Sequence, residues 1–408
     1  MKILMICEFF DPDLEFQENI AFKYYRKHGH DVRILTSTYS SVFDYYACRH
    51  DNTAPESSFK YDGGEIVRLP FRYNLLHKVR AYAGVKRHLD AFQPDLIFVH
   101  DISPNFPECV RYMRSHPDCR MIMDYHADYS NSGRNWLSLK LLHGIIRKYF
   151  LDRARPYLSR IFSVVPNGFV FLNEVYKVPM EEMELLPLGA DLDLIKEIRS
   201  ESNTRNLRSK YDLGSDDFVI VTGGKLEPRK KIELLIKAIQ SEQLHNVKVL
   251  VIGEFPPEAD DYRDTVMSSV QPVADRVHFT GWQSRDGVYQ HMLISDLAVF
   301  PASQSVLWQK AIACGLPLVC GNTGNQDLSY LNLYDNIRIQ HGDEINADGY
   351  RSVIEQLVAS PNLLASMAEG AQTAAKELLN WDLLIEQTTR FNNETHPVGA
   401  GVECSETA

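Results

Sequence analysis

The sequence predicts an α/β protein made of two similar halves, each a mostly parallel sheet covered by helices. Short apolar runs such as Lys2–Cys7 and Val219–Thr222 lack the polar alternation of a one-sided sheet, which indicates strands buried on both faces. Amphipathic stretches between such runs give the alternation typical of βαβ units. A polar, linker-like segment, Arg199–Asp217, lies near the middle of the 408 residues, so we expect two domains.

The first half contains strands whose ends carry polar groups. It begins with a strand, the loop Glu8–Phe16, a helix over Gln17–His28 and a second strand over Gly29–Thr36; Ser40–Gly64 is expected to be irregular. Further strands are predicted at Ile66–Pro70, Asp95–Asp101, Met121–Asp128 and Arg160–Val165. His100 and Asp101 end one strand, and Asp124 and His126 end the next. Because open α/β sheets bind ligands at the carboxyl ends of their strands, these side chains are candidate site residues.

The second half contains a candidate anion site. A strand, two glycines and a cationic loop that includes Lys225 and Lys230 come first. Later, a turn over Ser303–Ser305 precedes a short apolar helix that stops at Gly315, with serine as the expected N-cap and glycine as the C-cap. The amide end of such a helix favours anions, and the two lysines add positive charge. We expect a diphosphate to bind here.

Composition and charge exclude several classes. Apolar residues make up 44% and charged residues 24%, as in soluble globular proteins, and the net charge of −11 argues against nucleic-acid binding. Seven cysteines without a Cys-x-x-Cys pair favour a reducing compartment. No apolar run approaches the roughly 20 residues that span a bilayer, and the first residues are too short for a signal peptide. We therefore expect a cytoplasmic protein.

Two stretches of the first half, 72–88 and 134–160, combine cations with apolar side chains. One interpretation is an interfacial surface that contacts anionic lipid and a lipid-linked acceptor. The other is a helix packed on the sheet with a solvated cationic face.

Several motifs in order resemble the retaining, nucleotide-sugar-dependent glycosyltransferases of family 4. They are Gly224–Lys231, Gly281-Trp282, Gln309–Gly315 and Thr323-Gly324. The resemblance implies the GT-B fold, in which two Rossmann-like domains face each other across a cleft and a C-terminal helix crosses back to the first domain. It places an acceptor domain at 1–190, a nucleotide-sugar domain at 191–380, the crossover helix at 381–393 and a flexible tail at 394–408.

The resemblance also implies roles for particular residues. Catalytic roles fall to His126, Lys225 and Lys230. The Glu-x7-Glu pair of the family is absent; Gln304 and Ser305 take the place of the first glutamate and Gln309 that of the second. The whole expected donor-binding set is Gly224, Trp282, Gln283, Ser303, Gln304, Ser305 and Gln309. The first loop lacks the glycines of the family, so Glu15 and Gln17 are expected, with His100, Asp101 and Asp124, on the acceptor or sugar side; a plain solvated loop is the alternative.

The expected reaction transfers a sugar from a nucleotide-diphosphate sugar to a glycan, glycolipid or surface-polysaccharide acceptor, without a metal or any cofactor besides the donor substrate. The composition places such an enzyme in the cytoplasm, and the first interpretation of the two basic stretches would place it at the inner face of the cell membrane. Two alternatives remain: a nucleotide-sugar 2-epimerase of the same fold, and a catalytically inactive glycosyltransferase-like partner subunit.

Overall fold

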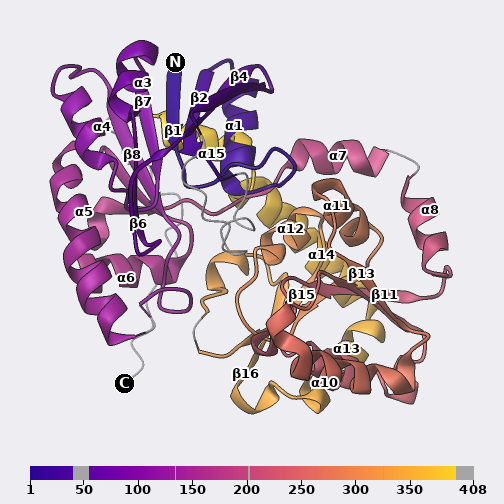
Figure 1. The fold of residues 1–408 in the computed structure, drawn as a ribbon. Coiled ribbons are helices and arrows are strands. Elements are labelled where there is room, and N and C mark those ends of the chain that lie inside the picture. Colours follow the sequence, from indigo (N-terminus) through magenta and orange to yellow (C-terminus); the bar gives the residue numbers. More distant parts are fainter. Residues whose placement is uncertain (40–54, 134, 201–202, 325, 392–408) are drawn as a thin grey trace. The chain divides into compact units, whose positions relative to one another are not determined.

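The computed structural model describes residues 1–39, 55–133, 135–200, 203–324 and 326–391, and it divides into two units (Figure 1). Unit 1 contains Met1–Pro187 and the described chain from Trp381 to Phe391, and unit 2 contains Leu188–Asn380. The predicted tail, 394–408, lies outside the described residues. Each unit has its own parallel sheet and its own core, in agreement with the predicted fold class.

The sheet of unit 1 has eight strands in the order β10-β9-β8-β7-β1-β2-β4-β3. All neighbours pair in parallel except β3 and β4, which are antiparallel. The strands are β1 (Lys2–Ile6), β2 (Asp31–Ser37), β3 (Ser57–Tyr61), β4 (Gly64–Leu69), β7 (Leu96–His100), β8 (Arg120–Tyr125), β9 (Arg160–Ser163) and β10 (Met183–Leu185); a separate hairpin is formed by β5 (Phe71–Leu75) and β6 (Val79–Tyr82).

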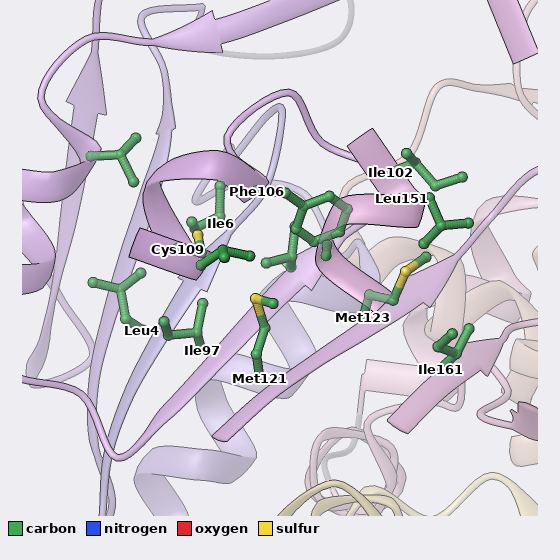
Figure 2. Close-up of a cluster of buried hydrophobic side chains, with 14 of the residues drawn as sticks. Leu4, Ile6, Ile97, Ile102, Phe106, Cys109, Met121, Met123, Leu151 and Ile161 are labelled. Carbon is green, nitrogen blue, oxygen red and sulfur yellow. The ribbon is translucent and has the colours of Figure 1, made fainter. Parts of the chain in front are cut away.

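Helices cover both faces of this sheet (Figure 1). On one face pack α3 (Val85–Phe92), α4 (Phe106–Met113), α5 (Lys148–Ala154) and α6 (Pro166–Tyr176). Figure 2 shows side chains of α4 and α5 beside those of β1, β7 and β8. A π-wound helix, η1 (Ser138–Arg147), leads into α5, and the single turns η2 (Arg155–Tyr157) and η3 (Met180–Glu182) follow.

The other face carries α1 (Gln17–Lys27) and the C-terminal helix α15 (Trp381–Thr389). Trp381 is fully buried against this face, and the hydroxyl of Tyr25 donates a hydrogen bond to Thr388 Oγ1 at 2.7 Å. A large aromatic ring supplies much of the apolar area that a helix can bury. The last described helix is therefore part of the core of unit 1, although 193 residues of unit 2 precede it.

The sheet of unit 2 has six parallel strands in the order β13-β12-β11-β14-β15-β16. They are β11 (Phe218–Gly223), β12 (Val247–Ile252), β13 (Val277–Gly281), β14 (Leu297–Phe300), β15 (Leu318–Asn322) and β16 (Ile337–His341). Its helices are α7 (Leu192–Ser200), α8 (Asn203–Lys210), α9 (Ile232–Ala238), α10 (Asp260–Val270), α11 (Arg285–Leu293), α12 (Leu307–Ala313), α13 (Ala347–Val358) and α14 (Pro361–Leu378). The single turns are η4 (Pro228–Lys230), η5 (Glu242–Leu244), η6 (Pro257–Ala259), η7 (Gln271–Val273), η8 (Ser329–Leu331) and η9 (Gly342–Glu344).

Three predicted elements differ from the structure. Strand β3 lies inside the segment 40–64 that was expected to be irregular, of which 40–54 lie outside the described residues. The basic stretch 72–88 is not one helix but the β5–β6 hairpin followed by α3, because Leu76 and His77 adopt positive φ and turn the chain. The linker-like segment after Arg199 contains α8.

Candidate active site

The carboxyl end of β11 is shaped by glycines that allow backbones to approach closely. Gly223, Gly224 and Gly253 have φ values of 155°, 116° and 114°. A Cβ on Gly223 would lie 2.1 Å from the Ile252 carbonyl oxygen, and one on Gly253 would lie 2.0 Å from the Gly224 carbonyl oxygen. Only glycine fits such contacts without displacing the backbone. These glycines bring the ends of β11 and β12 together. The loop after Gly224 then lies beside the loop that follows β14.

This loop lies at the point where the strand order of unit 2 reverses. The chain passes from β11 to β12 and β13 on one side and then returns to β14 on the other side of β11. In open α/β sheets ligands bind outside the carboxyl ends of the strands at such a point. The loop that follows β11 carries Gly224, Lys225 and Lys230, and the loop that follows β14 carries Ser303, Gln304 and Ser305. Two separate predicted segments therefore meet at the expected place.

Lys230 is the buried cation of this pair of loops. Its Nζ donates a hydrogen bond to the Gln304 carbonyl oxygen at 2.8 Å, and only 8% of the residue is exposed. A Cβ on Gly224 would lie 3.6 Å from Lys230 Cε and 3.9 Å from Ser305 Oγ, so these three residues are neighbours. Burial, with the charge of Arg229, lowers the pKa of the Lys230 ammonium to about 8. An anion bound beside Lys230 would offset that cost.

Lys225 is arranged differently. Its ammonium is exposed and pairs with Glu227 and Glu258, each at 3.1 Å. Hydrogen bonds to these two carboxylates raise the pKa of Lys225, so it is charged. The structure thus brings Lys230, Gln304 and Ser305 together, whereas Lys225 is held by carboxylates at the rim of the same loop.

The turn after β14 is more strained than its sequence suggested. Ser303 has a φ of 58°, and its buried hydroxyl has no hydrogen-bond partner among the described residues. Helix α12 begins at Leu307 with Val306 as its N-cap, one residue later than predicted, but Ser305 Oγ still accepts a hydrogen bond from the Leu307 amide at 3.3 Å. The predicted C-cap is confirmed: Gly315, at φ 79°, donates to the Ile312 carbonyl, and Leu316 donates to that of Ala311.

The other predicted donor-side residues lie in two further places. Trp282 is half exposed just beyond β13, where its backbone amide donates to Glu254 Oε1 at 3.2 Å. The side-chain Nε2 of Gln283 donates to the Thr280 carbonyl. Gln309 is buried: its Oε1 accepts from the Gly189 amide at 2.8 Å, and its Nε2 donates to the Tyr330 hydroxyl at 3.1 Å. A ribose contact by Gln309 would therefore require an exchange of one of these partners.

In unit 1, the strand ends β7 and β8 bring two imidazoles to one carboxylate. His100 Nδ1 and His126 Nε2 each lie 3.1 Å from the same oxygen of Asp124, Oδ2. Asp124 is fully buried, His100 is nearly so and stacks on Phe98, and His126 keeps 28% of its side chain exposed. Asp101, at φ 60°, accepts a hydrogen bond from the His126 amide at 3.1 Å and fixes the end of β8.

The shared carboxylate controls the charge of both rings. Burial works against an imidazolium, but Asp124 outweighs it and raises the pKa of His126 to about 9. The pKa of His100 is raised for the same reason. Burial likewise opposes the Asp124 carboxylate, yet the two histidines hold its pKa below the usual range. His126 is therefore a partly exposed cation at neutral pH, able to donate a hydrogen bond or a proton to a ligand.

The first turn of α1 contributes to the same group. Burial raises the pKa of Glu18, while His100 and His126 lower it in part. Gln17 is buried, and neither atom of its amide has a hydrogen-bond partner among the described residues. Glu15 is half buried in the preceding loop. The predicted acceptor-side residues Gln17, His100 and Asp124 thus lie at one edge of the sheet, together with Glu18, which the sequence analysis did not name.

The side chains of His100, Asp124 and His126 could also hold a cation, because one ligand atom from each lies within 4.8 Å of the others. Imidazole and carboxylate are ligands that zinc and other divalent ions accept. Motif spacing did not indicate this group, since the three residues come from two strands that are adjacent only in the fold.

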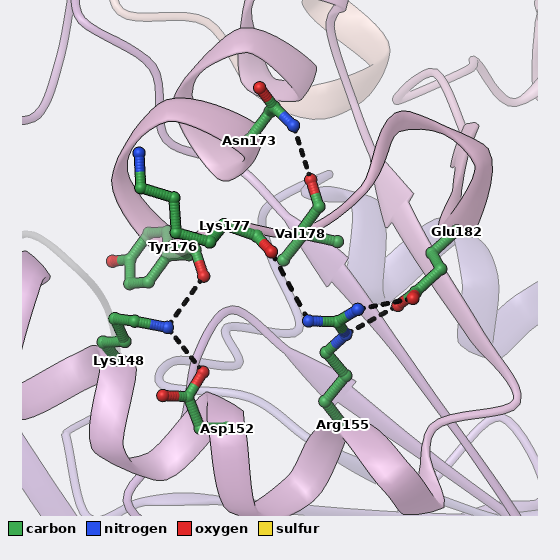
Figure 3. A network of polar contacts seen from close by, with 8 residues as sticks. All are labelled: Lys148, Asp152, Arg155, Asn173, Tyr176, Lys177, Val178 and Glu182. Atoms are coloured by element: carbon green, nitrogen blue, oxygen red, sulfur yellow. Dashed lines mark hydrogen bonds and ion pairs between the residues drawn. The ribbon is translucent and has the colours of Figure 1, made fainter.

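The second basic stretch, 134–160, is helical in its described part. Three of its cations hold neighbouring segments together: Lys148 donates to the Tyr176 carbonyl at 3.0 Å, Arg155 pairs with Glu182 and Arg160 with Glu184 (Figure 3 shows the first two). Lys148 also pairs with Asp152 of its own helix at 2.7 Å. The tip of the β5–β6 hairpin, in the first stretch, exposes Leu75 and Leu76. In the described residues we find no helix that is both long and apolar enough to cross a membrane.

Comparison with known families agrees with this geometry. Residues 203–374 match the family model of glycosyl transferases group 1, and residues 22–194 match that of glycosyltransferase family 4. The chain belongs to the family-4-like glycosyltransferases of the GT-B fold. The motif order that carried the resemblance is thereby confirmed at the level of family and fold.

A curated relative of this glycosyltransferase is a GDP-mannose-dependent α-(1-6)-phosphatidylinositol monomannoside mannosyltransferase from Mycolicibacterium smegmatis, 25% identical over 218 residues, or 50% of this chain and 54% of the relative. The chain spans about half or less of the length of the curated relatives it matches.

Two solved structures share the fold. Sucrose-phosphate synthase from Thermosynechococcus elongatus has a TM-score of 0.66 at 16% identity, and the match covers 95% of this chain and 96% of that one. Anabaena HepE in complex with UDP has a TM-score of 0.65 at 16% identity, with 95% and 98% covered.

Proposed function

We propose that this chain is a retaining, metal-independent hexosyltransferase. It takes a sugar from a nucleotide-diphosphate sugar and passes it to a glycan or lipid-linked acceptor of a surface polysaccharide or glycolipid. The observation that carries the proposal is the buried Lys230 beside Gly224 and Ser305 at the strand-order reversal of unit 2. The names of two similar proteins support it: one structure holds UDP, and one relative uses GDP-mannose and a phosphatidylinositol mannoside.

In this proposal the residues of unit 2 stabilise the leaving group. Negative charge grows on the β-phosphate as the bond to the anomeric carbon breaks, and fixed cations and amides directed at it lower the barrier by several kcal/mol. Lys230 supplies the buried charge, Lys225 a second one at the rim, and the Gly224, Ser303, Gln304 and Ser305 loops supply amides and hydroxyls. Trp282 and Gln283 flank the nucleobase, and Gln309 supports the ribose side.

The residues of unit 1 act on the sugar and the acceptor. His126, held as a cation by Asp124, donates a hydrogen bond to a sugar hydroxyl, and Gln17 and His100 with Asp101 and Glu15 order the acceptor side. Metal independence is supported by charge: both imidazole nitrogens lie 3.1 Å from one carboxylate oxygen, so two imidazolium rings can balance the buried Asp124 without a metal ion. We also propose that the enzyme works at the inner face of the membrane and that stretches 72–88 and 134–160 approach it.

The test is turnover of candidate nucleotide sugars by purified protein with lipid extracts as acceptors, with and without a chelator. Lys230→Ala should lower kcat by at least about a hundredfold, as expected for loss of a charge that stabilises the transition state, while Lys237→Ala, an exposed lysine of α9, should leave it unchanged.

Wild-type activity in Lys230→Ala would contradict the assigned role, and loss of activity after chelation would contradict metal independence. Incubation with donor alone separates the alternatives. An epimerised nucleotide sugar would indicate a 2-epimerase, and donor binding without any product would indicate an inactive partner subunit.

A further inference from the structure

The helix formed by η1 and α5 has an unusual distribution of side chains. Its most exposed apolar positions recur at every fourth residue through η1 and α5, and their exposed fractions place them on the outer side of the helix. Four of the five positions with this spacing are apolar, and the residue before the first is a tryptophan. The exposed fractions are 74% for Trp136, 59% for Leu137, 45% for Leu141, 62% for Ile145 and 49% for Tyr149; Arg153 is the fifth position. We call Trp136, Leu137, Leu141, Ile145 and Tyr149 the outer stripe.

The inward face of the same helix is polar at two positions. His143 is buried between the Tyr176 hydroxyl, at 2.6 Å from Nδ1, and Ser132 Oγ, at 3.0 Å from Nε2. Burial and the charge of Arg147 lower the pKa of His143 to about 4, so the ring is neutral. Burial would lower the pKa of Arg147, but Tyr176 and Asp101 raise it, which places its guanidinium among inward groups. The helix therefore buries polar groups beside its core residues Leu151 and Ala154 and also carries apolar groups on its outer face, unlike a helix that only covers a sheet.

The charges around the outer stripe are mostly positive. Residues 136–154 contain Lys140, Arg147, Lys148 and Arg153 and a single acid, Asp152, in a chain whose net charge is −11. Asp152 is already paired with Lys148 (Figure 3). Lys140 is exposed and has no carboxylate partner within the described part of the chain, and the Arg153 guanidinium lies 3.7 Å from the centre of the Tyr149 ring. The surface thus offers an apolar line flanked by two outward cations that no carboxylate neutralises.

We propose that the outer stripe docks this protein on an anionic lipid surface, with Trp136, Leu141 and Ile145 among the acyl chains and Lys140 and Arg153 at the headgroups. A helix that lies in a bilayer interface has this combination of tryptophan and aliphatic residues on one face and cations beside it. Contiguous exposed apolar surface of this kind marks an interaction site rather than a solvated face. The inference builds on the lipid-linked acceptor proposed above and narrows the membrane contact to one helix.

The test is co-sedimentation of the full chain with vesicles of phosphatidylcholine alone and of phosphatidylcholine with phosphatidylglycerol, without donor or acceptor. We expect binding to the anionic vesicles that weakens with added salt. Ile145→Glu should lower the vesicle partition coefficient by about tenfold or more, because a charge replaces an inserted side chain. Lys140→Glu should weaken binding to the anionic vesicles alone. The matched control is Met267→Glu, a similarly exposed apolar residue of α10, which should bind as the wild type does.

Thermal unfolding of Ile145→Glu should match that of the wild type, since Ile145 is exposed. The emission of Trp136 should shift to the blue with anionic vesicles, and Trp136→Phe should remove the shift. Equal binding by wild type and Ile145→Glu, or no binding to either vesicle, would overturn the proposal. So would a wild-type dimer that Ile145→Glu dissociates, because the stripe would then face a second copy. Lys230→Ala should still bind vesicles. Vesicle binding and glycosyl transfer are therefore tested separately, and either proposal can fail without the other.

Discussion

Burial lowers the pKa of the Lys230 ammonium, and this lowered pKa should make nucleotide binding depend on pH. With a pKa of about 8, a growing fraction of the residue is neutral above that pH in the free protein. A bound diphosphate favours the charged form, so binding should draw in a proton. We expect the affinity for UDP or GDP to fall as pH rises above 8, by up to about tenfold per pH unit while the lysine is neutral.

Calorimetry at pH 8.5 in two buffers of different ionisation enthalpy measures this proton uptake. Lys230→Arg is the control: it keeps a charge throughout the range and should bind with little pH dependence. An affinity that is flat between pH 8 and 9 in the wild type would contradict the assignment of Lys230 to the phosphates.

Asp124 should set the protonation of His126. The folded pKa of His126, about 9, lies above its ordinary value of 6.5, so the stability it contributes is fully present below pH 6.5 and is lost as pH rises through about 9. Asp124→Asn removes the carboxylate, and the pKa of His126 should then fall, because burial lowers it and only the weaker effects of Asp101 and Glu18 still raise it. Histidine NMR titration measures the shift, and urea unfolding at pH 6 should show a loss on the order of 3 kcal/mol, as for breaking a buried pair.

Asp118→Asn, an exposed carboxylate before β8, is the control and should change neither quantity. A His126 that titrates unchanged in Asp124→Asn would show that another group holds its charge.

At the scale of elements, the ends of β11 and β12 depend on glycine. Gly253→Ala would place a Cβ about 2 Å from the Gly224 carbonyl oxygen at a positive φ, so the loop after β11 must shift. We expect a loss of roughly 2–4 kcal/mol of stability together with weaker nucleotide binding. Denaturant unfolding and calorimetry measure the two effects. Gly214→Ala should change little, because only an Asp217 side chain is near that position, at ordinary contact distance.

The elements that the apolar pattern of the sequence could predict are the strongly buried ones. Strand β1, helix α1 and the β14–α12 pair follow the expected pattern, because burial dictates their apolar spacing. Strand β3 was missed because it is an antiparallel edge strand that is mostly exposed, so no apolar run marks it. The β5–β6 turn was missed because Leu76 and His77 are not residues that normally signal positive φ.

The candidate site was predictable only in part for a related reason. Strand-end positions identified His100, Asp124 and His126, but that both rings share one oxygen depends on the pairing of β7 with β8. Glu18 was missed because its coupling to these histidines crosses from α1 to the strand ends. Gln309 was chosen from motif order, which says nothing of the Gly189 amide and Tyr330 hydroxyl that it contacts.

At the scale of the whole molecule, the core of unit 1 is completed by the last described helix. Trp381→Ala should cost roughly 3–5 kcal/mol, the usual range for a fully buried tryptophan. The loss should appear in unit 1, as faster hydrogen exchange of β1 and β2 amides, while the amides of β11 and β12 keep their protection. Leu383→Ala, an exposed position of the same helix, is the control. Equal loss of protection in both units would contradict the division described above.

The two places where the chain enters and leaves unit 2 lie next to each other. Ala190 and Asn380 form a parallel bridge, and the Ala190 amide donates to the Leu379 carbonyl at 3.1 Å. Residues 188–380 are therefore an insertion in the chain of unit 1, and the two ends of this insertion are hydrogen-bonded to each other. Under the proposed function, exchanging residues 188–380 for those of another family member would test whether unit 2 alone sets the choice of donor.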